Sequence, residues 1–235
     1  MQAGTHFLNK YFYGVNHPLQ NPVFNALCSG DEALSFGTDT VKYFDEEVAP
    51  FAGFEQGNGH GFEELHALLQ PGRKIVYAVP VEIVLPHGWQ LKHHIKGLQF
   101  IYDGDTTVKN ESALIRALNK EHVDQMKALA ILTKPGPFEK RTIEFGHYHG
   151  IFEGGKLVAM TGQRMHVRNY TEISAVCTHP DHTGKGYALS LLLHQTQLIM
   201  KQGQQPFLHV RSDNERAIAL YKKNNFSISR PMNFY

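Results

Sequence analysis

The chain has 235 residues, a length that suits one large domain or two small ones. Its 23 Lys and Arg residues balance 22 Asp and Glu, which argues against general nucleic-acid binding, because that function usually leaves a strong basic excess. No segment approaches the ~18 consecutive apolar residues of a membrane span, and the start lacks an apolar core of signal-peptide length. We therefore expect a cytoplasmic protein without nucleic-acid or membrane partners.

Cysteine and histidine usage indicates neither a disulfide framework nor a metal site. Two cysteines, Cys28 and Cys177, are too few for either a disulfide framework or a cysteine-rich zinc site. The 15 histidines form loose pairs, and His147 and His149 would face one side of a strand. Because no third ligand stands at a recognisable spacing, we expect no metal.

The first hundred residues predict a mixed α/β unit that carries no recognisable chemistry. "NPVFNAL" opens with Asn-Pro, a helix-start signal, and "FEELHALL" (62–69) is a short amphipathic helix. "KIVYAVPVEIVL" (74–85) is strand-like but interrupted by Pro80. Turn-forming residues between about residues 97 and 112 suggest a domain boundary, with one domain at 1–105 and the next at 106–235.

The second part is more regularly patterned. Ser112 is a candidate cap for a helix through "ALIRALNK", and "VDQMKALAILT" continues the helical period up to "KPGP" (134–137). Three strand-like segments follow, and Gly154-Gly155 between the first two is a hairpin signal. We expect a short-looped antiparallel meander that ends in "TEISAVCTHP" (171–180).

A glycine-containing loop then separates this last strand from an apolar-periodic helix. In "HTGKGYA" (182–188) Gly184 and Gly186 allow an anion to approach the backbone, and the first N–H groups of a helix lack internal partners. Ala188 keeps the next position small, and Lys185 would add charge at the rim. The loop is neither a Walker motif nor a complete dinucleotide fingerprint, which argues against other nucleotide-binding enzymes.

The elements that flank the loop give it a more specific meaning. A helix with one apolar face from Leu189 to Ile199 is followed by the strand "PFLHVR" (206–211) and a helix capped by Asp213 or Asn214. This order over about residues 108–235 resembles the GNAT superfamily of acyl-CoA-dependent N-acetyltransferases. The residues that carry the resemblance are Thr183, Gly184, Lys185, Gly186, Tyr187 and Ala188 in the loop, then Asn214, Ala217, Leu220, Tyr221 and Phe226.

"LTKPGPFEKRT", "EISAVCTHP" and "GYA" further resemble a bacterial subfamily that shares a domain with glycine-acyltransferase-like proteins. Two positions depart from the superfamily pattern. Thr183 stands where Arg or Gln usually braces the loop, so its hydroxyl would do so only locally. Asn225 replaces a glycine before Phe226, and Asn tolerates the left-handed conformation that ends the helix there.

The resemblance implies an α+β or α/β GNAT fold. Its central mixed, mostly antiparallel sheet would be flanked by helices and preceded by a smaller α/β domain that is a degenerate GNAT-like half. It implies transfer of acetyl from acetyl-CoA to a primary amine of a small molecule or amino acid, without a metal. The expected coenzyme A contacts are the strand residues Val176, Cys177 and Thr178, the loop residues 183–188, and Asn214.

Two residues are candidates for acid-base roles. Tyr221 matches the tyrosine that protonates the leaving sulfur in many family members, and the alternative is a core aromatic. Glu172 is the general-base candidate, for which a pKa raised by burial would help, and the alternative is a solvent-facing strand carboxylate. Cys177 is expected to be a buried small apolar residue, because no His–Asp pair accompanies it.

The acceptor amine stays open. The early part of the domain commonly faces the acceptor in this family, and an Arg there would suit a carboxylate. The residues concerned are Arg141, His147, Tyr148, His149, Gln163 and Arg164. The N-terminal part is expected to cover the acceptor site without binding coenzyme A. A homodimer and a non-catalytic acyl-CoA sensor with the same fold remain alternatives.

Overall fold

The computed structural model describes residues 17–104 and 114–235. Their strands are β1 (Ser35–Gly37), β2 (Val41–Phe44), β3 (Ala52–Phe54), β4 (Ala78–Val79), β5 (Ile95–Tyr102), β6 (Ile115–Ala117), β7 (His149–Glu153), β8 (Lys156–Val167), β9 (Tyr170–Thr178), β10 (Gln205–Arg211) and β11 (Phe226–Phe234). Their helices are α1 (Pro22–Leu27), α2 (Gly61–Leu68), α3 (Val123–Thr133), α4 (Tyr187–Lys201) and α5 (Glu215–Lys223). Short 3-10 turns are η1 (Pro18–Gln20), η2 (Glu32–Leu34), η3 (Lys120–His122), η4 (Thr142–Phe145) and η5 (Pro180–His182).

A large mixed sheet organises the molecule. Its eight described strands lie in the order β4-β11-β5-β10-β9-β8-β7-β6, and β1, β2 and β3 form a separate small sheet. Neighbouring strands of the large sheet are antiparallel except β9 and β10. The predicted fold class is therefore confirmed, and the predicted meander is β7-β8-β9.

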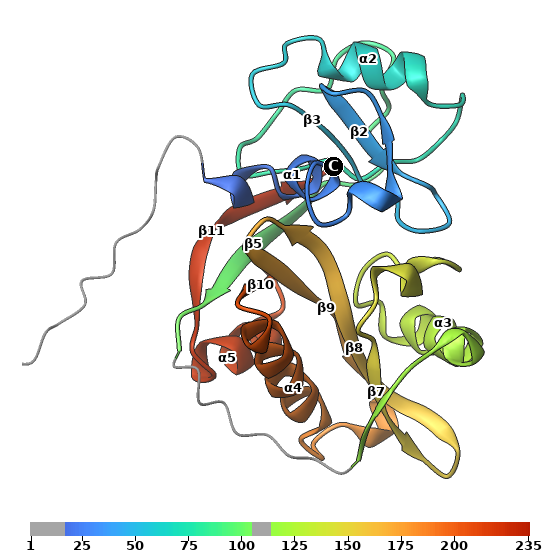
Figure 1. The fold of residues 1–235 in the computed structure, drawn as a ribbon, viewed down its shortest axis with the longest axis vertical. Helices are drawn as coiled ribbons and strands as arrows, with labels where there is room; N and C mark the ends of the chain where they lie inside the picture. The colour runs from blue at the N-terminus through green and yellow to red at the C-terminus, as the bar shows by residue number, and fades with distance from the viewer. Residues whose placement is uncertain (1–16, 105–113) are drawn as a thin grey trace, which may run out of the picture.

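Helices cover both faces of this sheet, with α3 on one side and α4 and α5 on the other (Figure 1). The apolar face of α4 is buried through Leu191, Leu192, Thr196 and Ile199. The predicted stripe shares Leu192, Thr196 and Ile199 with this face, whereas Leu189 and Leu193, which it also contained, are only half-buried.

The caps of the last two helices follow the sequence signals. Gly186 precedes α4 with a φ of 79°, a left-handed value that glycine adopts without steric cost. Asn214 caps α5, its Oδ1 accepting a hydrogen bond of 3.1 Å from the Ala217 N–H. Asn225 has a φ of 60°, which confirms the left-handed stop expected after α5.

The helix predicted from Ser112 through residue 120 is wrong where the structure describes it. Residues 115–117 form the edge strand β6, in which Ile115 pairs with Ile151 of β7. Pairing with an existing sheet edge outweighed the local helical period, and the next helix, α3, begins at Val123 as expected. Ser112 itself lies outside the described residues.

The strands of the N-terminal part cross the boundary expected at residue 105. β5 is hydrogen-bonded to β10 on one side and β11 on the other, and β4 pairs with β11. By sheet membership, residues 78–102 thus belong with the C-terminal half. Whether the chain divides into two independent domains stays a prediction.

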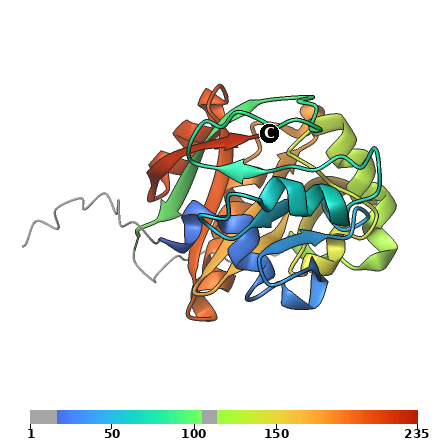
Figure 2. The same cartoon turned by 90° about the horizontal axis from the view of Figure 1, so that it is seen from above.

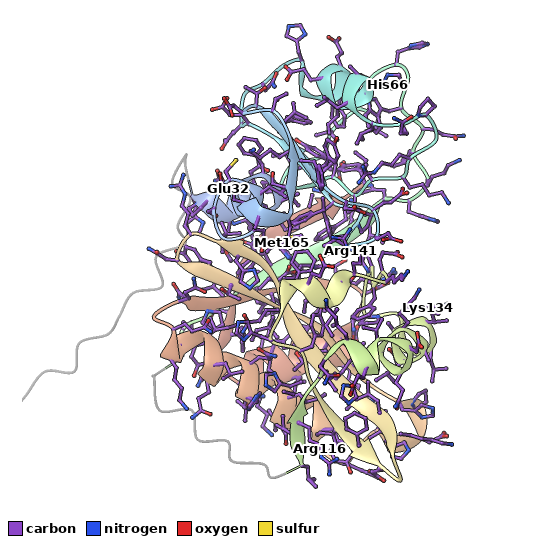
Figure 3. The ribbon with its side chains drawn as sticks, turned by 45° about the vertical axis from the view of Figure 1, so that its right-hand side comes forward. Glu32, His66, Arg116, Lys134, Arg141 and Met165 are labelled. Carbon is purple, nitrogen blue, oxygen red and sulfur yellow. The ribbon has the colours of Figure 1, made fainter. Side chains whose placement is uncertain are left out.

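The remaining N-terminal elements, α1, α2 and β1–β3, lie over one end of the large sheet (Figures 1 and 2). Figure 3 shows Arg141 and Met165 where the two parts meet. Met165 is fully buried, and Arg141 is ion-paired to Asp45 at 3.0 Å and to Glu144 at 2.8 Å. The contact is thus both apolar and ionic.

A buried carboxylate makes the most specific link between these parts. Asp31, 3% exposed, accepts hydrogen bonds from the His166 backbone N–H at 3.0 Å and lies 2.6 Å from His166 Nδ1. We expect Asp31→Ala to lower the free energy of unfolding by about 1–3 kcal/mol, because both donors lose their partner in a buried place.

The matched control is Glu32→Ala, which removes the neighbouring exposed carboxylate (Figure 3). Urea unfolding of the two variants measures the difference, and equal stabilities would show that the Asp31–His166 contact does not hold the parts together.

Candidate active site

The site begins where two parallel strands separate. β10 pairs with β9 through Gln205–Phe207 and residues 170–172, and beyond these residues the strands diverge. A bulge bends β9 at this point, since its register against β8 shifts between Met160 and Gly162. Ala175 lies in the bulge with a φ of 54°, unusual for a residue with a side chain. A wedge-shaped gap between β9 and β10 results.

Backbone N–H groups of β9 face this gap. The His179 N–H donates to Val158 O of β8 at 2.7 Å. Because successive N–H groups on an extended strand point to opposite edges, the Cys177 N–H also points to β8. The N–H groups of Val176 and Thr178 therefore point toward the gap, so two of the three predicted strand residues offer a backbone donor there.

The gap opens into a cavity of about 1200 Å³. One end lies at the glycine loop and the N-terminus of α4, and α5 forms one wall. The opposite end is lined by the last turn of α3 and by the segment after it (residues 134–138). Phe51, Val76 and Ile95, which precede α3 in the chain, complete this end. The predicted loop, strand and α5 residues, except Lys185, thus surround one space.

The loop glycines are open to this cavity. Gly184 and Gly186 have φ values of 82° and 79°, and a Cβ built on either would meet no atom within 4 Å. The first hydrogen bond of α4 runs from Ser190 N to Gly186 O at 3.0 Å, so the earlier N–H groups of the helix remain for a ligand. The residue in the Arg/Gln position, Thr183, is braced only locally, its Oγ1 donating to Pro180 O at 3.0 Å.

The charge of Lys185 is directed away from the cavity. Its Nζ lies 2.9 and 3.0 Å from the two carboxylate oxygens of Glu153 on β7, and it is absent from the cavity lining. Tyr187 O–H donates to the same carboxylate, and His182 Nδ1 lies 3.2 Å from it. These hydrogen bonds lower the pKa of Glu153 to about 2. Glu153 therefore ties the loop to the β7–β8 hairpin.

Glu172 lies at the inner end of the gap, fully enclosed. Its side chain is 1% exposed, and it forms a two-pronged ion pair with Arg164, with Nε–Oε2 at 2.8 Å and Nη2–Oε1 at 2.9 Å. His209 Nδ1 lies 2.8 Å from Oε1. Because the Gln99 amide nitrogen, a donor, lies 3.0 Å from His209 Nε2, the imidazole carries its proton on Nδ1 and donates it to Glu172.

This network differs from the solvent-facing alternative for Glu172, and it lacks the raised pKa that would help a general base. Burial opposes its charge, but the Arg164 guanidinium and the His209 hydrogen bond outweigh burial and lower the pKa to about 2. A carboxylate with so low a pKa is a poor proton acceptor near neutral pH.

Tyr221 is both a core residue and a cavity residue. Its ring packs against Phe100 and Phe226, with centroids at 5.9 and 6.1 Å, and the residue lines the cavity. Burial raises its pKa to about 12, so the hydroxyl keeps its proton at neutral pH. The predicted acid and the predicted core aromatic are therefore compatible descriptions of one side chain.

Cys177 is buried, 7% exposed, as expected for a small apolar residue. Burial raises the pKa of its thiol to about 11, so the thiolate needed for a nucleophile is scarce at neutral pH.

The cavity lining carries more cations than carboxylates although the whole chain is nearly neutral, and one of these cations, Arg211, is paired with Asp213 at 2.7 Å. Among the described residues that line it, one is a carboxylate, Glu172, and five are Lys or Arg: Lys134, Arg164, Arg211, Arg216 and Lys223. Such a lining raises the local concentration of anionic ligands.

Among the described residues, no group of three or more His, Cys, Asp or Glu side chains could hold a metal ion. Within the same ranges every helix is too short or too polar to cross a bilayer.

The acceptor-facing candidates divide into two sets. Arg164 lines the cavity. Arg141 is instead ion-paired at the junction of the two parts. Gln163 hydrogen-bonds to Gln195 of α4 at 3.0 Å, and Gln195 also donates to His147 O.

Sequence reasoning missed two cavity residues. His209 stood unmarked inside "PFLHVR", and Phe51 lies over a hundred residues away from the motif that defined the site.

Comparison with solved structures identifies the relatives of this fold. A GNAT-family protein from Novosphingobium aromaticivorans, assigned as an acetyltransferase, is 32% identical to the chain with a TM-score of 0.87, and the match covers 93% of this chain and 97% of that protein. The chain belongs to the GNAT family. This membership supports an acetyltransferase in general.

Solved structures of lower sequence identity share the fold. A GCN5-related N-acetyltransferase from Kribbella flavida is 16% identical, with a TM-score of 0.61 over 92% of this chain and 95% of that one. A Drosophila protein is 12% identical, with a TM-score of 0.64 over 96% of this chain and 91% of its own. The family model described as FR47-like protein matches residues 148–233. No curated protein matches the sequence significantly.

The low pKa of Glu172 predicts a pH-dependent stability. Because the folded-state pKa lies below that of an unfolded Glu, about 4.3, the carboxylate stabilises the fold above that pH and loses this effect as pH falls toward the folded value. We expect the free energy of unfolding of the wild type to fall more steeply than that of Glu172→Gln between about pH 5 and pH 3, measured by urea unfolding.

Glu153→Gln is the comparison variant. Glu153 also has a pKa of about 2, but its side chain is 35% exposed, so solvent screens its ion pairs and the slope should change less. A wild-type slope equal to that of Glu172→Gln would contradict the ionised buried pair.

Proposed function

We propose that the protein transfers acetyl from acetyl-CoA to the primary amine of a small molecule. The observation that carries this proposal is the continuity of one cavity from the open glycine loop at the N-terminus of α4 to the gap between β9 and β10. The loop suits a diphosphate, and the gap suits an amide-bearing arm that ends in a thioester.

The residues present fit coenzyme A. Backbone N–H groups around Gly184 and Gly186 are open to a diphosphate, and the cationic lining from α5 suits a further phosphate. The gap leaves backbone groups of Val176 and Thr178 in need of partners, which amides of a pantetheine arm would supply. Thr178 Oγ1 is buried without a hydrogen-bond partner among the described residues, so it offers a further polar contact.

The same assignment gives the predicted coenzyme A residues separate roles. Thr183, Gly184, Gly186, Tyr187 and Ala188 would form the diphosphate end. Asn214 would shape the α5 end, where it also caps the helix. Lys185 would act indirectly, by fixing the loop to Glu153. Cys177 would contribute apolar lining, since its own N–H points to β8.

In the proposed reaction the amine nitrogen attacks the thioester carbonyl, a C–N bond forms and the C–S bond breaks. The nitrogen loses a proton and the departing sulfur gains one. The gap-facing N–H of Val176, the nearer of the two to the point where β9 and β10 part, would stabilise the negative charge that develops on the carbonyl oxygen, and Thr178 would remain for the pantetheine arm. Tyr221 would protonate the sulfur, because its hydroxyl is retained in the protonated form at the cavity wall.

Glu172 takes a different role in this proposal from the base expected of it. With three hydrogen bonds and a pKa of about 2, the carboxylate would position Arg164 and His209 at the inner end of the gap. The amine would then bind in its neutral form or give its proton to water, without transfer to Glu172.

The loop assignment can be tested with two matched glycine variants. Gly186 immediately precedes α4 and has a φ of 79°, and Gly203 lies just after α4 with a φ of 73°. A Cβ built on either glycine meets no atom within 4 Å. Alanine should therefore cost about 1–2 kcal/mol of stability at both positions, from the left-handed backbone alone. Only Gly186→Ala puts a methyl group on the proposed diphosphate site, so it should weaken coenzyme A binding about 10-fold or more, as measured by calorimetry.

Gly203→Ala, outside the cavity lining, should bind coenzyme A like the wild type. Equal affinities of the two variants would rule out the loop as the diphosphate site.

The acid role is tested by Tyr221→Phe. The ring and its packing are retained, so coenzyme A affinity should stay the same while kcat for acetyl transfer falls about 100-fold or more. Tyr170→Phe is the control, because the Tyr170 hydroxyl lies 3.3 Å from His17 Nε2 and outside the cavity lining. Stopped assays of free thiol release against a panel of amines measure the rates.

Tight coenzyme A binding by the wild type without turnover of any amine would instead favour the acyl-CoA sensor. Turnover by Tyr221→Phe at the wild-type rate would leave acetyl transfer in place and remove Tyr221 as the acid.

A further inference from the structure

We propose that Arg164 is the carboxylate-binding residue for the acceptor, and that the acceptor is an amino acid with an apolar side chain. The inference rests on the proposed acetyl transfer and assigns a substrate class to the end of the cavity opposite the glycine loop.

Arg164 is held rigidly. The residue is 9% exposed, and Glu172 binds one edge of its guanidinium, accepting from Nε at 2.8 Å and from Nη2 at 2.9 Å. One face of the guanidinium lies over the ring of Phe51, with Cζ 4.6 Å from the centroid. A guanidinium fixed on one edge and one face has little conformational freedom left to lose when a ligand binds.

The other edge of the guanidinium is turned toward the cavity. Neither hydrogen bond to Glu172 uses Nη1. A Cβ built on Gly136, which lies in the segment after α3 and lines the cavity, would come within 4.0 Å of Nη1. Nη1 thus presents N–H donors of a charged group at the cavity wall, the arrangement that carboxylates bind in proteins.

Apolar side chains line the cavity together with Arg164. Phe51, Val76 and Ile95 come from the N-terminal part, Phe138 from the segment after α3 and Phe234 from β11. An amine bound here would place its side chain among them, and burial of an apolar side chain would contribute to its affinity. Three of the five are aromatic, which favours a large apolar or aromatic group.

The charges at this end suit one carboxylate. Arg164 is already balanced by Glu172, and Lys134 at the end of α3 lines the same cavity (Figure 3). The second cation would compensate the negative charge that the ligand adds. Because Glu172 lies beside Arg164, a doubly charged phosphate would be repelled more strongly than a carboxylate.

Paired substrates test the proposal with the wild-type protein. Phenylalanine and phenethylamine share an amine and an aromatic side chain, and differ by the carboxylate. A charge-assisted hydrogen bond of ordinary strength predicts kcat/KM for phenylalanine about 10- to 100-fold above that for phenethylamine. Phenylalanine amide should behave like phenethylamine, since it keeps the size of the group and lacks the charge.

A double variant then assigns the preference to Arg164. Removing Arg164 alone would leave Glu172 buried without its partner, so the variant combines Arg164→Met with Glu172→Gln. The ratio of phenylalanine to phenethylamine kcat/KM should fall to about threefold or less. The control combines Arg141→Met with Glu144→Gln, an ion pair of 2.8 Å outside the cavity lining, and should keep the wild-type ratio.

Each outcome decides the proposal. A wild-type ratio of one or below, or a ratio that survives in the Arg164 double variant, overturns the carboxylate site and leaves acetyl transfer standing. Coenzyme A binding without turnover overturns acetyl transfer, and calorimetry with coenzyme A present then compares N-acetylphenylalanine with N-acetylphenethylamine. Tighter binding of the carboxylate compound supports the site, and equal affinity overturns it.

Discussion

The separation of β9 from β10 is the constraint on which the rest of this structure depends. Two adjacent strands that stop pairing expose rows of N–H and C=O groups, a costly arrangement inside a protein. The outer neighbours limit this cost, because β8 continues along β9 to Thr178 and β5 continues along β10 to Arg211. What remains unpaired lines a single gap, so the backbone itself prepares a place for a ligand that carries amides. The bulge at Ala175, with its left-handed φ, bends β9 away and fixes where the gap begins.

The same constraint explains why a strand that precedes the C-terminal half in the chain is part of the large sheet. β5 must lie beside β10 to stabilise it after β9 has diverged, and β5 comes from residues 95–102. The chain before β5 then brings Phe51 and Val76, and β5 itself brings its first residue Ile95, to the end of the cavity opposite the glycine loop. Links such as Asp31 with His166 hold these elements against β8. The N-terminal part therefore completes the large sheet through β5 and closes the cavity through its apolar residues, while the loop and the α4 N-terminus come from the C-terminal half.

Local patterns predicted what local chemistry determines. The glycine loop, the long helix after it, the Asn214 cap and the left-handed Asn225 depend on neighbours a few residues away, and all were recognisable in the sequence. β6 was mistaken for a helix because only its pairing with β7 makes it a strand. The low pKa of Glu172 could not be foreseen from the sequence for the same reason. Its partners Arg164 and His209 are 8 and 37 residues away, and burial with partners has the opposite effect on a carboxyl pKa from burial alone.

The buried pair of Glu172 and Arg164 is better explained by position than by stability. Taking two charges out of water costs as much as their attraction returns in many proteins, and apolar replacements often stabilise such sites. Here the pair lies at the point where β9 and β10 part, and it bridges β8, β9 and, through His209, β10. Removing the carboxylate would free the guanidinium to turn and the imidazole to change its protonated nitrogen. An ion pair that adds little net stability over an apolar pair, yet fixes the orientation of two cavity side chains, is expected where a ligand must be held in one geometry. Positioning of Arg164 and His209, more than proton transfer, accounts for a glutamate so deeply enclosed beside the proposed reaction centre.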